Sequence, residues 1–215
     1  LWSLWLEGAE YCSNSWKLNF KPSITNIRAM LILTLCQHPS SFDYDWMDQN
    51  WIDIGDIVRI AQTMGMHRDP QWFALDIYER EERRRLWYLI QTLDTYQTLL
   101  QGLPPLIRTG TTDVQFPAHA NLSTVAKFWK YFQPESEENS PASFQSSNIM
   151  CDPFPIRTEM SFFLARSAIS MLSTQIYNIT TSLETPNVPY EQILALDSKE
   201  IVLIVLEMSI LLLHY

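Results

Sequence analysis

Two amphipathic stretches joined by a short proline-containing turn constrain this chain most. Apolar residues recur every three or four positions over residues 54–64 and again over residues 86–100, which is the spacing of one face of an α-helix. Gly65 stands where the first pattern stops, and Pro70 prevents its continuation. Gly102 and the prolines after it stop the second pattern. The sequence therefore predicts a helix, a closed turn, a second helix and an irregular exit.

Acidic and basic residues interleave at the start of the second helix. Glu79 and Arg83, and likewise Glu81 and Arg85, lie four positions apart with the glutamate first, which is the favourable order on a helix. We therefore interpret the three consecutive arginines of residues 83–85 as part of a salt-bridged surface or of a polar seam between helices. The formal charge of −9 also argues against direct contact between this chain and a nucleic-acid backbone, which requires clustered positive charge.

The turn between the two helices begins with His67, Arg68 and Asp69. Adjacent residues at a helix end point in different directions, and no nucleophile pattern accompanies these three, so we predict that they close the helix and do not catalyse a reaction. Asp69 is expected to accept hydrogen bonds from the backbone or from an arginine of the next helix. Asp94 lies beside the apolar stripe, and we predict that it is partly buried and paired with Arg59 or Arg68.

The unit from residue 51 to residue 117 carries residues that are unusual together. They are Trp51, Arg59, Ala61, Gly65, His67, Arg68, Asp69, Glu82, Arg83, Arg84, Arg85, Leu86, Trp87, Asp94, Gly102, Pro104, Asp113, Val114 and Pro117. In this order and nearly this spacing, they resemble the fungal-specific transcription factor domain, the middle regulatory region of fungal zinc binuclear cluster transcription factors. We interpret these family residues as structural, and the resemblance assigns no ligand-binding residue.

The chain departs from the family pattern at a few positions. Met64 and Met66 replace leucines, and Tyr88 replaces a second tryptophan. Methionine preserves the volume and apolarity of leucine, so no change of fold is expected. Thr95 stands where an arginine is usual, and Leu103 lies between the glycine and the proline of the exit.

The resemblance implies a nuclear protein that controls RNA polymerase II transcription. In the family, an N-terminal zinc binuclear cluster reads DNA, so zinc is expected in that missing region and no cofactor is expected in this chain. The middle region regulates activity, in some members by binding a small-molecule inducer. The partners implied are therefore an inducer, a second copy of the chain or a transcriptional co-regulator. A helical scaffold or dimerisation domain that senses no ligand remains the alternative.

The periodicity predicts an irregular all-α domain of about seven or eight helices and no strand. We expect one domain over residues 1–215, as a fragment of a longer chain because the sequence does not begin with methionine. Helices are expected over residues 24–38 and 157–183, with an acidic loop at residues 39–49. Residues of about 133–155 are rich in Ser, Glu, Asn and Pro, which predicts a mobile internal linker.

The residue patterns favour no enzyme class. The sequence has no glycine-rich phosphate loop, nucleophile elbow or paired carboxylates at catalytic spacing, so we predict no catalytic residues. The helical enzymes of isoprenoid metabolism place two acidic residues next to each other, and the acidic loop lacks such a pair. The three cysteines are far apart, so no metal site is predicted. The apolar runs near the end fall short of the roughly 20 residues that cross a bilayer, so no membrane contact is expected.

Overall fold

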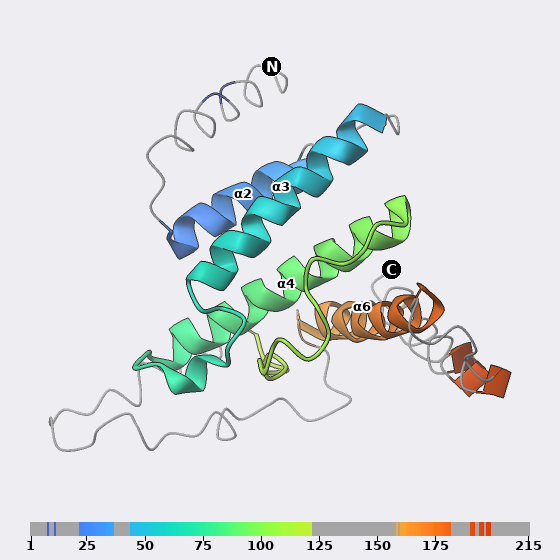
Figure 1. The fold of residues 1–215 in the computed structure, drawn as a ribbon. Coiled ribbons are helices and arrows are strands. Elements are labelled where there is room, and N and C mark those ends of the chain that lie inside the picture. Colours follow the sequence, from blue (N-terminus) through green and yellow to red (C-terminus); the bar gives the residue numbers. More distant parts are fainter. Residues whose placement is uncertain are drawn as a thin grey trace, which may run out of the picture.

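The computed structural model is helical wherever it describes regular structure (Figure 1). It describes residues 22–36, 44–121, 158 and 160–181, together with residues 8 and 11 and six positions between 190 and 198. Its elements are α2 (Ile24–Cys36), α3 (Tyr44–Thr63), the 3-10 helix η1 (Pro70–Trp72), α4 (Ile77–Gln101) and α6 (Met160–Thr181). These residues contain no strand, which confirms the all-α prediction.

The number of helices is not confirmed. The described ranges contain four α-helices and one 3-10 helix, against the prediction of about seven or eight helices. The linker predicted at about 133–155 lies outside the described residues, and the single domain over residues 1–215 stays a prediction. The helix predicted over residues 157–183 is present as α6. Among the described residues, no helix has both the length and the apolar character needed to cross a membrane.

The core forms where α2, α3 and α4 meet. On α3 the predicted apolar stripe is the buried one, because residues three or four apart share one face of a helix. On α4 the prediction is wrong for most of the stripe: of Leu86, Leu89, Ile90, Leu93, Tyr96 and Leu100 only Ile90 is buried, and polar residues make up most of the buried face. The buried apolar residues of these helices are Ile27, Met30, Leu31, Ile54, Ile57, Val58, Ala61, Trp87, Tyr88 and Ile90. One side of α2 lies outside this core, since Ile32 is 60% exposed and Leu35 is 49% exposed.

Gly65 ends α3 through a left-handed backbone conformation. Its φ is 72°, and its N–H donates to the carbonyl oxygen of Gln62 at 3.0 Å. The N–H of Met66 donates to the carbonyl oxygen of Ala61 at 2.9 Å, which completes the pair of bonds that closes many helices. A Cβ atom at Gly65 would lie 3.1 Å from the ring of Phe73. The glycine is therefore required by both the backbone and the neighbouring side chain.

Helices α3 and α4 both begin earlier than predicted. Residues 44–49 were expected in a loop but form the start of α3, and Gln49 Nε2 donates to Asp53 Oδ1 within the helix at 3.1 Å. Acidic residues near a helix start are favoured by the positive end of its dipole, and this effect acts on α3 itself. Asp76 caps α4 and accepts from the N–H of Glu79 at 2.7 Å. Gly102 ends α4 with a φ of 67°.

The chain then turns back along α4 as an irregular connector, residues 102–121, as Figure 1 shows. This part of the prediction is confirmed, because none of these residues is helical or extended in a sheet. Next, α6 packs against α4 through a hydrogen bond of 2.8 Å between the hydroxyl oxygens of Thr95 and Thr174. The N–H of Thr158 donates to Ser161 Oγ at 3.0 Å, which satisfies a donor at the start of α6.

Candidate functional site

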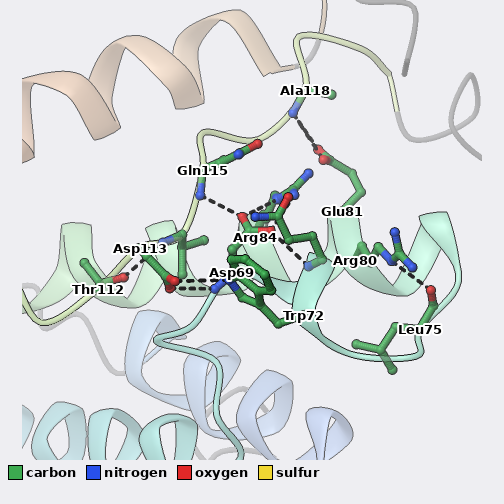
Figure 2. A network of polar contacts seen from close by, with 12 residues as sticks. Asp69, Trp72, Leu75, Arg80, Glu81, Arg84, Thr112, Asp113, Gln115 and Ala118 are labelled. Atoms are coloured by element: carbon green, nitrogen blue, oxygen red, sulfur yellow. Dashed lines mark hydrogen bonds and ion pairs between the residues drawn. The ribbon is translucent and has the colours of Figure 1, made fainter. Parts of the chain in front are cut away.

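A buried carboxylate, Asp69, joins the turn, α4 and the connector (Figure 2). Two of its hydrogen bonds come from Arg84, whose Nη2 lies 2.8 Å from Oδ1 and whose Nε lies 3.1 Å from Oδ2. Backbone N–H groups supply two more, from Gln71 to Oδ1 and from Gln115 to Oδ2, each at 2.9 Å. The predicted pairing of Asp69 with the backbone and an arginine of the next helix is confirmed.

These contacts decide the protonation of Asp69. Burial raises the pKa of this carboxyl group, but the hydrogen bonds from Arg84, Gln115 and Gln71 oppose burial and hold the pKa below its ordinary value. The guanidinium of Arg84 is itself buried, so the two charges compensate each other out of water. The site is therefore an ionised pair whose acceptor positions are already filled.

Glu81 anchors the connector one turn before Arg85. Its carboxylate accepts from Arg85 Nε at 2.8 Å and from the N–H of Ala118 at 3.0 Å. Arg85 continues to the connector by donating from Nη2 to the carbonyl oxygen of Ala120 at 2.8 Å. Burial raises the pKa of Glu81, and the bonds from Arg85 and Ala118 oppose that rise. The sequence predicted the pair of Glu81 and Arg85. It did not predict that both residues also bind the backbone of the connector.

Asp94 is buried, but its predicted partner is wrong. Its side chain is 2% exposed and accepts from the N–H of Ile107 at 2.9 Å and from the N–H of Leu106 at 3.1 Å. Arg59 instead contacts Asp56, and Arg68 contacts Asp113. A connector without secondary structure has free N–H groups that must be satisfied, and these compete with arginine for a buried carboxylate. Burial raises the pKa of Asp94, with the two N–H groups opposing.

Asp113 forms an outer layer of the same network. It accepts from the N–H of Asp69 at 2.8 Å and from Trp72 Nε1 at 3.2 Å, and its ion pair with Arg68 is 3.0 Å long. The Trp72 side chain is mostly exposed although its indole N–H is bonded to Asp113. The sequence placed Arg68 and Asp113 in the family pattern but gave no signal that they pair.

Arg83 does not pair with Glu79 as predicted. Its Nη1 donates to the carbonyl oxygen of Met64 at 3.4 Å, and its guanidinium carbon lies 5.8 Å from the centre of the Phe73 ring. A positive charge at the end of α3 is favoured by the negative end of the helix dipole. Glu82 forms an ion pair with Arg28 of α2. The acidic and basic run therefore joins helices, as the seam interpretation expected, but through other partners.

The remaining family residues lie in the core or at its edge. Trp87 is buried, and its ring centre lies 6.4 Å from that of His67. Leu86 packs against the core, whereas Pro104 is exposed in the connector. Among the described residues, no group of three or more His, Cys, Asp and Glu side chains could hold a metal ion. The contacts of the site hold the turn, α4 and the connector together.

Comparison with known proteins assigns this arrangement to a family. A family model described as the fungal-specific transcription factor domain matches residues 9–202. The chain belongs to this family. The matched range includes the residues from Gly65 to Pro117 that form the buried network in this chain.

Curated relatives of the domain are fungal transcription factors. The chain is 30% identical over 150 residues to the Zn(2)-C6 fungal-type transcription factor pigI of Monascus ruber, covering 69% of this chain and 16% of that protein. It is 30% identical over 151 residues to the equisetin cluster transcription factor eqxF of Fusarium heterosporum, covering 69% of this chain and 19% of that protein.

One relative has a higher sequence identity over a shorter stretch of the chain. The chain is 46% identical over 54 residues to the transcription factor macR of Penicillium terrestre, covering 25% of this chain and 6% of that protein. The chain thus spans less than a fifth of the length of these relatives. No solved structure matches the chain. Transcription factors are in general nuclear proteins without enzymatic activity, and zinc belongs to the DNA-binding region of the Zn(2)-C6 class.

Proposed function

We propose that this chain is the regulatory domain of a nuclear factor that restrains or permits RNA polymerase II transcription in response to a small-molecule inducer. The zinc binuclear cluster that reads DNA would lie elsewhere in the parent protein. The observation that carries the proposal is the family match over residues 9–202, together with relatives that are all named as transcription factors.

The targets proposed for the parent protein follow from the same relatives. Two of them are named as transcription factors of the equisetin cluster and of the fusarisetin A cluster. We extend this to a parent protein that controls one biosynthetic cluster.

The geometry supports regulation because α4 is joined to the connector and to α6 by different kinds of contact. Asp69, Glu81 and Asp94 tie the connector to α4 and the turn through buried hydrogen bonds. In contrast, α6 meets α4 through neutral hydroxyl groups, including the pair of Thr95 and Thr174, while Phe163 and Met171 of α6 pack against the core. Neutral hydrogen bonds cost less to exchange than buried charged ones. We therefore place the proposed rearrangement at α6.

An inducer acts only if it binds one arrangement more tightly than the other. A difference of about 1.4 kcal/mol between the two affinities changes the ratio of the arrangements tenfold. The restrained and active arrangements of the proposal would differ at α6, while the network around Asp69 stays intact. Contacts with a second copy or a co-regulator would bias the same equilibrium.

A reporter assay tests the proposal. The chain is inserted between a heterologous DNA-binding domain and an acidic activation segment, and an unrelated helical domain of equal length is the control insertion. We expect reporter output several-fold below that of the control. Output should return to the control level when a metabolite extract of the fungus that encodes this chain is added. Output equal to the control, with or without extract, overturns the regulatory proposal. A stable dimer by light scattering together with that result supports the alternative of a scaffold or dimerisation domain.

A further inference from the structure

Four buried polar atoms at one end of the α3 and α4 pair have no hydrogen-bond partner. They are Asn50 Oδ1 and Trp51 Nε1 on α3, and Gln97 Nε2 and Thr98 Oγ1 on α4. The side chains of Asn50, Gln97 and Thr98 are 7%, 0% and 1% exposed. Burial removes their hydration, and native proteins pair almost all such groups. No described residue pairs with any of the four, so the group is open to a bound partner.

Leu106 of the connector lies next to both helices and therefore marks a common position along the axes of α3 and α4. A Cβ at Gly55 of α3 would lie 3.4 Å from Leu106 Cδ1, and Asp94 of α4 accepts from the Leu106 N–H at 3.1 Å. The two helices run in opposite directions, as Figure 1 shows. Trp51 is one turn before Gly55, and Gln97 is one turn after Asp94, so both lie one turn beyond Leu106 in the same direction.

A second contact gives the same register from the other end. Arg83 of α4 donates to the carbonyl oxygen of Met64, just after α3. Asn50 lies 14 residues before Met64, and Gln97 lies 14 residues after Arg83. Equal numbers of residues span equal lengths of helix, so Asn50 and Gln97 are level across the pair. Two independent contacts thus place the unpartnered residues of α3 and α4 at the same level along the helix pair.

The chemistry of these atoms specifies a ligand. Gln97 Nε2 and Trp51 Nε1 donate, and one carbonyl oxygen has two lone pairs that can accept from both. Asn50 Oδ1 accepts, and an N–H or O–H next to that carbonyl can donate to it. Asp94, the nearest charged group along α4, is already satisfied by backbone N–H groups. Arg59 of α3 is exposed and already paired with Asp56, which disfavours an anion as the ligand.

We propose that this end of the α3 and α4 pair binds a small neutral molecule with a carbonyl group beside an N–H or O–H donor, such as a lactam, an amide or a hydroxy ketone. Trp51 contributes an apolar ring beside its donor. The site deepens the proposed function, on which its regulatory meaning rests. Thr98 lies one turn from Thr95, which contacts α6, so a ligand here adjoins the joint proposed to move.

Nuclear magnetic resonance of the indole N–H groups tests the site directly. The ¹⁵N-labelled full chain is titrated with 2-pyrrolidinone, a lactam with both the carbonyl and the N–H, and the signal of Trp51 is assigned from Trp51→Phe. We expect a saturable shift of the Trp51 signal in the millimolar range. The signal of Trp72, which is exposed and bonded to Asp113, is the internal control and should not move.

Matched changes to probe and protein define the contacts. N-methyl-2-pyrrolidinone lacks the N–H and should bind about tenfold more weakly, the ratio expected when one buried acceptor stays unpaired. Gln97→Leu should weaken binding by a similar factor, although it also removes the hydrogen bond that Gln97 Oε1 accepts from Gln101 Nε2 at 3.1 Å. Thr98→Val is the second variant, and because it removes only an unpaired hydroxyl it should not lower the unfolding midpoint.

An unmoved Trp51 signal at saturating lactam, or equal shifts of the Trp51 and Trp72 signals, overturns the site. Equal affinity for the two lactams overturns the assigned chemistry. The reporter assay above uses a different readout, so a regulatory domain without this site would still restrain the reporter.

Discussion

Arg84 and Asp69 form a two-point ion pair in which 3% and 0% of the side chains are exposed. The same carboxylate accepts backbone N–H groups from the turn and the connector, at Gln71 and Gln115. One pair of residues therefore joins α4, η1 and the connector, which are separate in the sequence. The stability of this junction depends on both charges being present, because each would otherwise be buried alone.

Removing one member of this pair should cost much of the stability of the domain. Asp69→Ala leaves the Arg84 guanidinium buried without its carboxylate, and a loss of about 3–5 kcal/mol in the free energy of unfolding is expected. Arg59→Ala is the control, since its pair with Asp56 is exposed and should contribute less than about 1 kcal/mol. Urea unfolding measures both. Similar losses for the two variants would contradict the role assigned to the buried pair.

Two glycines offer a matched comparison of strain and contact. Gly65 and Gly102 have φ values of 72° and 67°, so alanine is strained by about 1 kcal/mol at either position. At Gly102 a Cβ meets nothing within 4 Å, whereas at Gly65 it lies 3.1 Å from the ring of Phe73. Gly65→Ala should therefore lower the thermal midpoint more than Gly102→Ala. In a Phe73→Leu background, Gly65→Ala should lower the thermal midpoint only as much as Gly102→Ala does. An unchanged extra loss in that background would refute the contact with the Phe73 ring.

The buried carboxyl of Asp94 should make stability depend on pH. Burial raises its pKa in the folded chain above the unfolded value of about 3.8, so between these two values the folded chain binds more protons. The stability that protonated Asp94 provides is therefore lost as pH rises through that window. Asp94→Asn should flatten this part of the profile of unfolding free energy against pH. The exposed Asp56→Asn should leave the profile unchanged, and a profile that Asp94→Asn does not alter would exclude this assignment.

Asp69 should act in the opposite sense at lower pH. Its folded pKa lies below its ordinary value, so its contribution is present above the unfolded pKa and is lost as pH falls through the folded pKa. Acid unfolding should therefore begin at higher pH in Asp69→Asn than in the parent chain. Unfolding at the same pH would show that Asp69 does not control acid stability. Asp53→Asn, at an exposed bond within α3, is the control.

The hydroxyl pair between α4 and α6 should show coupling. Thr95→Val or Thr174→Val alone leaves the other hydroxyl without its partner across the interface, at a cost of about 1 kcal/mol. The double variant should lose less than the sum of the single variants, because it removes both hydroxyls and each is replaced by a methyl group. A double-mutant cycle by urea unfolding measures the difference. Strict additivity would mean that the two hydroxyls do not stabilise the joint.

The sequence alone determined the helical character of the chain and the C-terminal ends of α3 and α4. Apolar spacing predicted the buried stripe of α3 but not that of α4, and Gly65 and Gly102 marked the stops, because these signals depend on residues close together in the chain. The Glu81 pair with Arg85 was likewise within reach, since the two residues are one turn apart. Local patterns contain the information for local structure.

Only the tertiary structure decided which distant groups meet. Asp94 lay on the predicted face, yet it binds the backbone of Leu106 and Ile107 and no arginine. Arg83 contacts Met64 and Phe73 and does not form the predicted pair with Glu79. A connector without a regular pattern has no sequence signal for its path, and its N–H groups take whichever buried acceptors the packing brings near. That competition is settled by the three-dimensional packing of α4 against the connector, and periodicity along the chain does not record it.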